Sequence, residues 1–545
     1  MKLSDYYGVP DGKALIIIDE TVYEKYALYK DGMTYIDLET VKNMYTHRFF
    51  PVEAENTVIF TTPTEVYDFV PGSKEFMCNG ERSGSSVPVV IKSESQYYVA
   101  TAFLEQSGIT YKFYDDPARI LITYSDEQYL CMDVEDETPV RSGKNLDSDR
   151  LKELKKGDCL RVIDGGGIRE NGFIKVQTED GVRGYVLQDD LGESYYADPQ
   201  FVDYKEPKYT HIDIPGNIYL GWELLYNSDN VGYLKEHLAA APELNVVAPT
   251  WFFLDGTDGR FISYASHDYM KYAKEKGVSV WATYKNDTIE GRFNCTEDSH
   301  TILSSTQKRR ALIDSIMESV HEYELDGVNI DFEMLKLDSG TFFVEFLREL
   351  SIRCRLNNVV LSVDNYVPEA YNAYYDITEQ GKIVDYVVIM GYDQHYAGSK
   401  ESGSVSSLDW FTNALNSTTQ MAPPERVIMG VPFYTRLWRE ENGGKVYVEA
   451  TLNMREMKDK VSGRELTWRE SNGQYYSEWT RKGSFYRIWL EDSESLKRKV
   501  DASQKAKVKG IAAWKLGDEE AGTWEMIKEY MENDHSAECA LPPEK

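Results

Sequence analysis

The 545-residue chain contains 42% hydrophobic and 13% aromatic residues, a composition that excludes an intrinsically disordered protein. The chain is too long for one ordinary core, so roughly two to four domains are expected. Its formal charge of −31 makes nucleic acid an unfavourable partner, because a phosphate backbone would be repelled.

The chain start and the hydropathy bear on location. No run approaches the ~20 apolar residues of a membrane helix, so no membrane span is predicted. The start, MKLSDYYGVP, lacks the basic and apolar regions of a signal peptide, which taken literally predicts a soluble intracellular protein. The function inferred below favours instead the exterior or cell envelope of a bacterium, with an export signal that is absent from this chain.

The sequence shows no motif for a metal site or an organic cofactor. The 6 cysteines are scattered without a CxxC pair, so neither a zinc site nor a dense disulfide framework is predicted. We expect no metal and no organic cofactor.

Residues 1–132 contain two similar stretches, one from Tyr35 and one from Tyr97, each read as strand, short helix and further strands. This pattern predicts a small α+β domain built from a duplicated unit. It resembles the copper amine oxidase N-terminal-like domain, an extracytoplasmic accessory module of bacteria. No copper site is implied, because these residues contain no histidine cluster.

Residues 133–195 change to short strands and glycine turns. The stretch GFIKVQTEDGVRGYV predicts a β-hairpin that turns at Asp180-Gly181. The segment resembles a bacterial SH3-like all-β barrel, with Phe173 where such domains often have tryptophan. A spacer and a wall-binding module are both open roles for it.

Residues 205–533 alternate apolar strands with amphipathic helices, and residues 534–545 are expected to be a flexible tail. One such helix, residues 306–323, carries an apolar stripe. Eight predicted βα repeats indicate a (β/α)8 TIM barrel with the helices outside. The predicted strands are IYLGWELL, LNVVAPTWFFL, VSVWATY, LDGVNIDFE, NVVLSVDNY, VDYVVIMGYD, RVIMGVPFY and KGIAAWKLG.

The fourth predicted strand carries polar residues at every second position. Asn329, Asp331 and Glu333 share one face of the strand, and Val328, Ile330 and Phe332 share the other. An edge strand with one wet face would explain this alternation. A barrel strand is covered on both faces, so the three polar side chains should instead point into the barrel, with Glu333 at its C-terminal end.

Asp331 and Glu333 are spaced for acid–base chemistry. The strand rise places them about 6 to 7 Å apart, close enough for one carboxylate to raise the proton affinity of the other. A carboxylic acid held protonated near neutral pH is what a glycosidase needs to protonate a leaving oxygen. A buried hydrogen-bond network that only stabilises the barrel is the structural alternative.

The stretch DGVNIDFE resembles the DxxDxDxE signature of glycoside hydrolase family 18, the chitinase-like group. Asp326, with Gly327 beside it, would be structural in this motif, and Asn329 stands where an aspartate is usual. The stretches MGYD, GVPFYTR and GIAAWKLG on the sixth to eighth strands support the resemblance. It is strongest to the branch of spore-cortex and cell-wall N-acetylglucosaminidases.

The resemblance implies substrate-assisted retaining hydrolysis, in which the 2-acetamido oxygen of the sugar attacks the anomeric carbon. Glu333 would be the acid and then the base, and Asp331 would orient the acetamido group. Tyr392 would hydrogen-bond the acetamido carbonyl. The expected substrate-binding residues are Asn329, Met390, Asp393, Trp514, Tyr434 and Trp251, with Trp222 as a further stacking candidate. Arg436 could contact substrate or pair with an acidic neighbour.

The expected partner is a carbohydrate polymer that carries N-acetyl groups, either peptidoglycan or a chitin-type oligosaccharide. The upstream modules favour peptidoglycan. A non-hydrolytic lectin or scaffold on the same barrel is the alternative class, although the retention of Glu333, Asp331 and Tyr392 argues against it.

Overall fold

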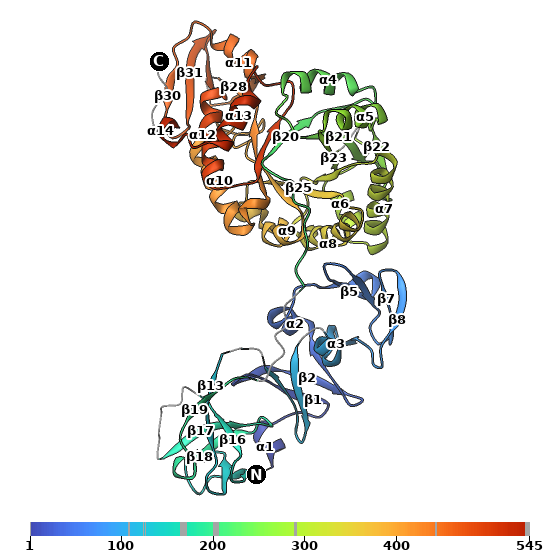
Figure 1. Ribbon diagram of the computed structural model, residues 1–545, viewed down its shortest axis with the longest axis vertical. Coiled ribbons are helices and arrows are strands. Elements are labelled where there is room, and N and C mark those ends of the chain that lie inside the picture. The colour runs from blue at the N-terminus through green and yellow to red at the C-terminus, as the bar shows by residue number, and fades with distance from the viewer. Residues whose placement is uncertain are drawn as a thin grey trace. The chain divides into compact units, whose positions relative to one another are not determined.

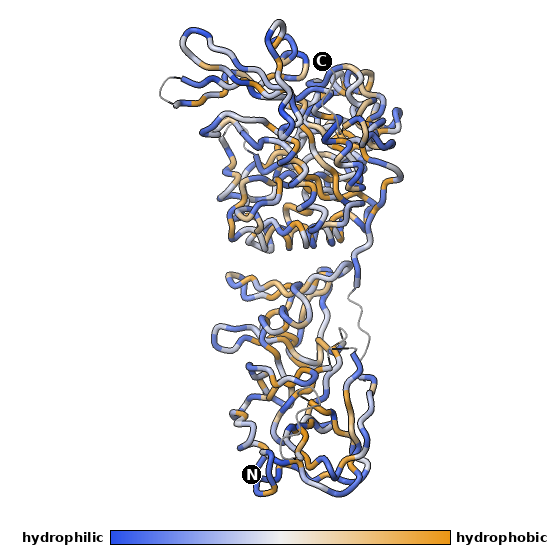
Figure 2. The backbone as a smooth tube through the Cα atoms, turned by 90° about the vertical axis from the view of Figure 1, so that its left-hand side faces the viewer, coloured by the Kyte–Doolittle hydropathy of each residue, from blue (hydrophilic) through white to orange (hydrophobic). Residues whose placement is uncertain are grey.

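The computed structural model describes residues 2–106, 109–123, 125, 127–163, 172–199, 207–287, 291–441 and 444–539. The chain divides into two compact units, residues 1–207 and 208–545. In both units, hydrophobic and hydrophilic stretches alternate along the chain (Figure 2).

The first unit begins with an α+β part built on two sheets. A 7-stranded sheet has the order β11-β12-β1-β2-β3-β10-β9, and β4 to β8 form a 5-stranded antiparallel sheet in chain order. The elements are β1 (Lys13–Ile18), β2 (Thr21–Lys30), β3 (Met33–Asp37), α2 (Leu38–Met44), β4 (Phe49–Val52), β5 (Thr57–Thr61), β6 (Val66–Phe69), β7 (Glu75–Cys78), β8 (Glu81–Gly84), β9 (Val90–Ser93), β10 (Gln96–Ala100), α3 (Thr101–Gln106), β11 (Thr110–Asp115) and β12 (Ala118–Thr123).

The two similar stretches fold alike locally. β3 and β10 each run directly into a helix, α2 or α3, which a hairpin follows, β4–β5 or β11–β12. β3 and β10 pair antiparallel with one another, whereas the two hairpins belong to different sheets. The local repeat is therefore present, but each copy continues into a different sheet.

An all-β part completes the first unit with a 7-stranded sheet of order β15-β14-β18-β17-β16-β13-β19. β17 and β18 pair across the turn at Asp180-Gly181, where Gly181 has φ of 80°, as the hairpin pattern predicts. The predicted boundary at residue 133 cuts β13. The strands are β13 (Tyr129–Asp133), β14 (Thr138–Arg141), β15 (Arg150–Leu154), β16 (Cys159–Val162), β17 (Phe173–Thr178), β18 (Arg183–Leu187) and β19 (Tyr195–Ala197).

The second unit is a closed barrel of eight parallel strands, because β20 pairs with both β21 and β33. Seven of the eight strands fall within the predicted stretches, and β23 extends one residue beyond its stretch, to Lys285. They are β20 (Ile218–Glu223), β21 (Val246–Leu254), β23 (Ser279–Lys285), β24 (Gly327–Asp331), β25 (Val360–Tyr366), β26 (Tyr386–Met390), β27 (Val427–Pro432) and β33 (Gly510–Trp514).

Helices surround these strands, as Figure 1 shows for α4, α5, α7, α8, α9 and α10. α7 covers the predicted range, and Ile313, Ile316 and Val320 of its stripe are buried. The helices are α4 (Val231–Ala240), α5 (His267–Lys276), α7 (Thr306–Tyr323), α8 (Gly340–Leu356), α9 (Ile377–Ile383), α10 (Leu408–Met421), α12 (Ser493–Lys505) and α13 (Thr523–Glu532).

An inserted α+β segment between β27 and α12 was not predicted. It holds a 5-stranded antiparallel sheet of order β29-β28-β32-β31-β30, beside α12 and α13 in Figure 1. Its elements are β28 (Tyr434–Glu440), β29 (Val446–Asn453), α11 (Met454–Val461), β30 (Thr467–Arg469), β31 (Gln474–Arg481) and β32 (Ser484–Trp489). Tyr434 and Arg436 therefore lie on the insertion and not on the seventh barrel strand.

The expected flexible tail is partly structured. Ser536–Cys539 form a short helix, α14, and Glu538 pairs with Lys497 of α12 at 3.3 Å. Residues 540–545 of that predicted tail lie outside the described residues. Among the described residues, no helix is long and apolar enough to cross a membrane.

Candidate active site

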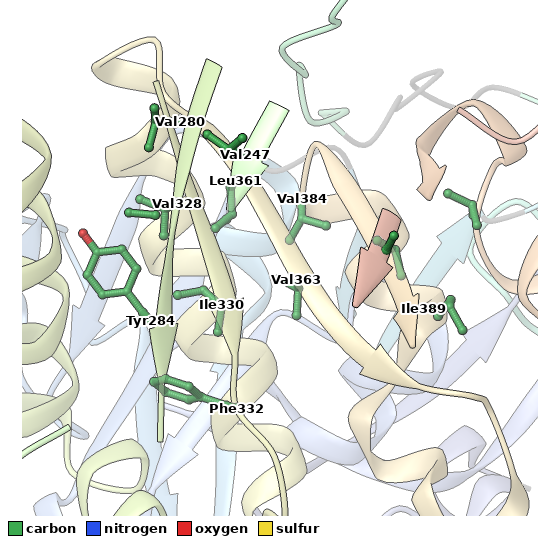
Figure 3. Packing of buried hydrophobic residues seen from close by; sticks show 14 of the residues in the cluster. Val247, Val280, Tyr284, Val328, Ile330, Phe332, Leu361, Val363, Val384 and Ile389 are labelled. Atoms are coloured by element: carbon green, nitrogen blue, oxygen red, sulfur yellow. The ribbon is translucent and has the colours of Figure 1, made fainter. Parts of the chain in front are cut away.

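β24 separates its apolar and polar side chains as the alternation predicts. Val328, Ile330 and Phe332 belong to the core between the barrel and its helices, and Figure 3 shows them in line along the strand. Asn329 and Asp331 point to the other side, into the barrel. The structure thus rules out an edge strand, because β24 pairs with β23 on one side and β25 on the other.

Asp331 is held by a lysine that the sequence analysis did not single out. Lys285, the last residue of β23, is paired in register with Asp331 and donates a hydrogen bond to its Oδ2. The other carboxylate oxygen, Oδ1, is buried without a hydrogen-bond partner among the described residues. A buried carboxylate oxygen normally accepts a hydrogen bond, so Oδ1 is an acceptor to which a ligand N–H could donate.

Asn329 is the centre of a fully buried polar network. Its Oδ1 accepts hydrogen bonds from Thr283 (3.1 Å) and Trp222 (3.4 Å), and its Nδ2 donates to Ser362 (3.0 Å) and Asp364 (2.8 Å). All its hydrogen-bonding capacity is used within the protein. Asn329 therefore holds its four neighbours together in the barrel interior and has no donor left for substrate.

Asp364, on β25, is a further acidic residue that sequence reasoning missed. Burial, and then the charge of Asp331, raise its pKa well above its ordinary value, against the hydrogen bond from Asn329. Both of its oxygens accept hydrogen bonds, Oδ1 from Asn329 and Oδ2 from Trp222. The alternation of Ser362 and Asp364 in NVVLSVDNY is the sequence signal that could have identified it.

Glu333 lies two residues beyond β24 and not on it. Its side chain is 38% exposed, whereas that of Asp331 is 6% exposed, so Glu333 is the acid that solvent and substrate can reach. Burial, and then the negative charge of Asp331, raise the pKa of Glu333 to about 7, while Lys285, 3.9 Å away, lowers it. Glu333 can thus hold a proton near neutral pH and release it on demand.

Hydrogen bonds fix the loop that carries Glu333. Asn286 accepts from the Glu333 backbone N–H and donates to its carbonyl, both at 2.7 Å. The hydroxyls of Tyr375 and Tyr374 donate to the carbonyls of Phe332 (3.1 Å) and Leu335 (2.8 Å). The acid is therefore placed by a rigid loop, although it lies outside regular structure.

The residues after β26 are positioned by the insertion. Tyr434 and Arg436 of β28 donate to Asp393 Oδ1 at 2.5 and 2.6 Å, which identifies the partner of Arg436 as an acidic neighbour. Tyr392 packs edge-on against Trp222, with ring centroids 6.3 Å apart. Burial raises the pKa of Tyr392 well above its usual range, so its phenol remains a hydrogen-bond donor.

The aromatic residues expected to contact sugar fall into two groups. Trp514 is half-buried at the end of β33, and its ring centroid lies 6.2 Å from that of Trp222. The Lys285 Nζ lies 5.8 Å from the Trp514 ring centroid. Trp251 is fully buried and packs on Tyr269 of α5, so the expectation that it stacks on substrate is wrong. β21 turns Trp251 toward the helical layer. Met390 ends β26 and is 9% exposed.

Asp326 and Gly327 lie at the opposite, N-terminal end of β24. Asp326 accepts a hydrogen bond from the Val280 N–H at 2.9 Å. A Cβ at Gly327 would lie 2.4 Å from the Trp281 ring, so only glycine fits there. Within the described part of the chain, no group of three or more metal-ligating side chains is arranged to hold an ion.

Comparisons with known proteins agree with this geometry. Residues 291–519 match the model of glycosyl hydrolases family 18, and residues 136–192 match that of the bacterial SH3 domain. The chain is 24% identical over 293 residues to the uncharacterized glycosylase YvbX of Bacillus subtilis, covering 52% of this chain and 84% of YvbX.

Two further matches extend the comparison. The chain is 25% identical over 252 residues to the cortical fragment-lytic enzyme of Bacillus anthracis, covering 44% of this chain but only 57% of that enzyme. The fold matches the crystal structure of the Bacillus megaterium spore cortex-lytic enzyme SleL with a TM-score of 0.51 at 18% identity, covering 65% of this chain and 78% of SleL. The barrel of this chain is therefore a glycoside hydrolase domain of family 18, and a bacterial SH3 domain precedes it in the chain.

Proposed function

We propose that the protein hydrolyses β-1,4 glycosidic bonds that follow N-acetylglucosamine in bacterial peptidoglycan, with retention of configuration and with the substrate's acetamido group as the nucleophile. The observation that carries this proposal is the Asp331–Glu333 pair. One acid is reachable and has a pKa raised to about 7, and the other is buried with one oxygen unpartnered.

The first step would use both acids at once. Glu333 would donate its proton to the glycosidic oxygen as the bond from that oxygen to the anomeric carbon breaks. The acetamido oxygen would form a bond to the same carbon and give an oxazolinium ion. Asp331 Oδ1 would accept the acetamido N–H and stabilise the positive charge that develops there.

The second step would return the acid to its starting state. Ionised Glu333 would take a proton from water while the water oxygen attacks the anomeric carbon and the oxazolinium ring opens. Tyr392 would hydrogen-bond the acetamido carbonyl, and Trp514 would offer an apolar surface to the sugar ring. Asp393, fixed by Tyr434 and Arg436, would bind a sugar hydroxyl.

Three observations support a wall polymer as substrate. A bacterial SH3 domain lies upstream of the barrel, and the matched Bacillus anthracis relative is named for lysis of cortical fragments. The neutral donors and ring faces of the site suit an uncharged N-acetyl sugar. A location at the bacterial exterior or cell envelope follows from this substrate.

The test is mass spectrometry of soluble, borohydride-reduced products after incubation with purified peptidoglycan and, in parallel, with N-acetylglucosamine oligomers. Glu333→Gln is the blank. Glu425→Gln, which removes an exposed carboxylate before β27 at the far end of the barrel, is the matched control and should keep full activity.

Muropeptides with reduced N-acetylglucosamine ends, made by the parent and the control but not by the blank, would support the proposal. Products from the oligomers alone would identify a chitinase-type enzyme. Binding without products from either polymer would favour a lectin. Peptidoglycan whose glucosamine residues are de-N-acetylated should resist cleavage, since it lacks the nucleophile.

A further inference from the structure

Lys285 is a buried cation among acidic groups from three consecutive strands of the barrel. Its side chain is 10% exposed and forms ion pairs with Asp331 and, at 3.9 Å, with Glu333. The Trp514 ring lies on another side, with its centroid 5.8 Å from Nζ. Burial of an ammonium is unfavourable unless it is paired, so this lysine is held in the barrel by the acids of the site.

The negative charge around Lys285 is smaller when Glu333 holds its proton. The ionisable groups facing the pair are Asp331 at the end of β24, Glu333 after it, Asp364 and Tyr366 of β25, and Asp287 after β23. Burial raises the pKa of Asp364, and its two oxygens accept hydrogen bonds from Asn329 and Trp222, so the carboxylate that Lys285 binds directly is that of Asp331. When Glu333 releases its proton, a second carboxylate that pairs with Lys285 becomes charged.

Lys285 orients the carboxylate of Asp331 through one hydrogen bond. Lys285 occupies Oδ2, and Oδ1 has no partner among the described residues. A free aspartate side chain would rotate and present either oxygen. The ammonium bound on one side fixes the carboxylate plane, and the register between β23 and β24 places both groups at the same level of the barrel.

We propose that Lys285 is a positioning residue for the hydrolysis inferred above: it fixes Asp331 with Oδ1 available to the acetamido N–H, and it stabilises the carboxylate that forms on Glu333 when the glycosidic oxygen takes its proton. This inference rests on the proposed function and assigns a role that none of the sequence motifs carries. Lys285 itself forms no bond to substrate and transfers no proton.

The first test is the pH profile of kcat/KM for Lys285→Met and Lys285→Arg with an N-acetylglucosamine oligomer. Loss of the cation removes the attraction that lowers the pKa of Glu333, so the alkaline limb should move to higher pH in Lys285→Met. We expect kcat to fall about 100-fold with KM changed less than 5-fold. Lys285→Arg should restore the position of the limb.

Lys499 provides the matched control, because it is also a fully buried lysine paired with a carboxylate but lies outside the site. Lys499→Met should leave the pH limb where it is in the parent. An unmoved limb in Lys285→Met, or a loss confined to KM, would overturn the proposal and leave Lys285 as a packing residue.

A second test needs no substrate and therefore separates this inference from the proposed function. Thermal unfolding of Lys285→Met should show a larger loss of Tm at pH 8.5 than at pH 5.5, because at the higher pH ionised Glu333 repels the buried carboxylate of Asp331 and Lys285 no longer offsets that repulsion. Adding Glu333→Gln should reduce that pH dependence. Equal losses at both pH values would contradict the role assigned to Lys285, even if the parent enzyme proves inactive on every polymer tried.

Discussion

Two buried lysine–carboxylate pairs in the barrel unit differ in how their oxygens are used. In the pair Lys499–Glu491, both carboxylate oxygens are bound: Oε1 by Lys499 (2.5 Å) and Ser495 (2.7 Å), and Oε2 by Gln474 (2.7 Å). In the pair Lys285–Asp331, one oxygen has no partner among the described residues.

The difference is the one expected between a structural pair and a pair in the proposed active site. The Glu491 network joins α12 to β31, and through Gln474 it reaches Ser404 in the segment after β26, so every bond stabilises the contact between barrel and insertion. The Asp331 network leaves one acceptor unused beside a reachable acid. A buried acceptor without a partner is unfavourable for folding, so Oδ1 of Asp331 is a candidate for contact with a ligand.

The sharpest test of this comparison is removal of the reachable acid. Glu333→Gln should lower kcat about 1,000-fold, because the leaving oxygen loses its proton donor. In the parent enzyme, kcat/KM should fall as the pH rises above about 7, since Glu333 acts as an acid only while protonated. Steady-state kinetics from pH 5 to 9 measure both effects, and a parent profile that is flat across pH 7 would exclude Glu333 as the titrating acid.

Loss of the unpartnered oxygen should have the next largest effect. Asp331→Asn keeps the size of the side chain but removes its charge, and we expect a loss of about 100-fold in kcat on N-acetylglucosamine oligomers. Circular dichroism and thermal unfolding verify that the variant is folded. A variant with unchanged kcat would show that Asp331 belongs with the structural pair.

The structural pair should respond in stability and not in catalysis. Lys499→Met leaves Glu491 buried without its cation and should lower the free energy of unfolding by about 3 to 5 kcal/mol. The companion Lys499→Met/Glu491→Gln should recover part of this loss. Denaturant unfolding measures it, and kcat per folded molecule should stay within about 2-fold; a large fall in kcat would mean that the two pairs are coupled.

The smallest effect is a gain in stability. The pKa of Glu333 is raised from 4.5 to about 7 on folding, so its proton stabilises the folded state at low pH and this contribution is lost as the pH rises from 4.5 to 7. Glu333→Gln should thus be more stable than the parent at pH 8, by about 1 kcal/mol after allowance for solvent screening of this partly exposed group. The difference should vanish at pH 4, and a destabilised variant at pH 8 would contradict it.

The pattern of apolar and polar residues in the sequence predicted much of the fold and part of the site. The succession of apolar stretches and amphipathic helices identified all eight barrel strands, because a parallel barrel strand is covered on both faces. Period-2 alternation identified the inward face of β24. The inserted sheet escaped prediction because its strands are half-exposed and interrupt the βα rhythm. Trp251 was misassigned because sequence alone does not state which face of β21 its ring occupies.

The sequence by itself determined which residues could do the chemistry: two acids two positions apart at the end of a buried strand, in a barrel whose strand ends gather reactive groups. Only the tertiary structure decided their states. Lys285, Asp364 and Asn286 come from other strands and loops, so their distances from the two acids exist only in the folded chain. There, burial and the charge of Asp331 raise the proton affinity of Glu333, Lys285 lowers it, and one oxygen of Asp331 has no partner among the described residues.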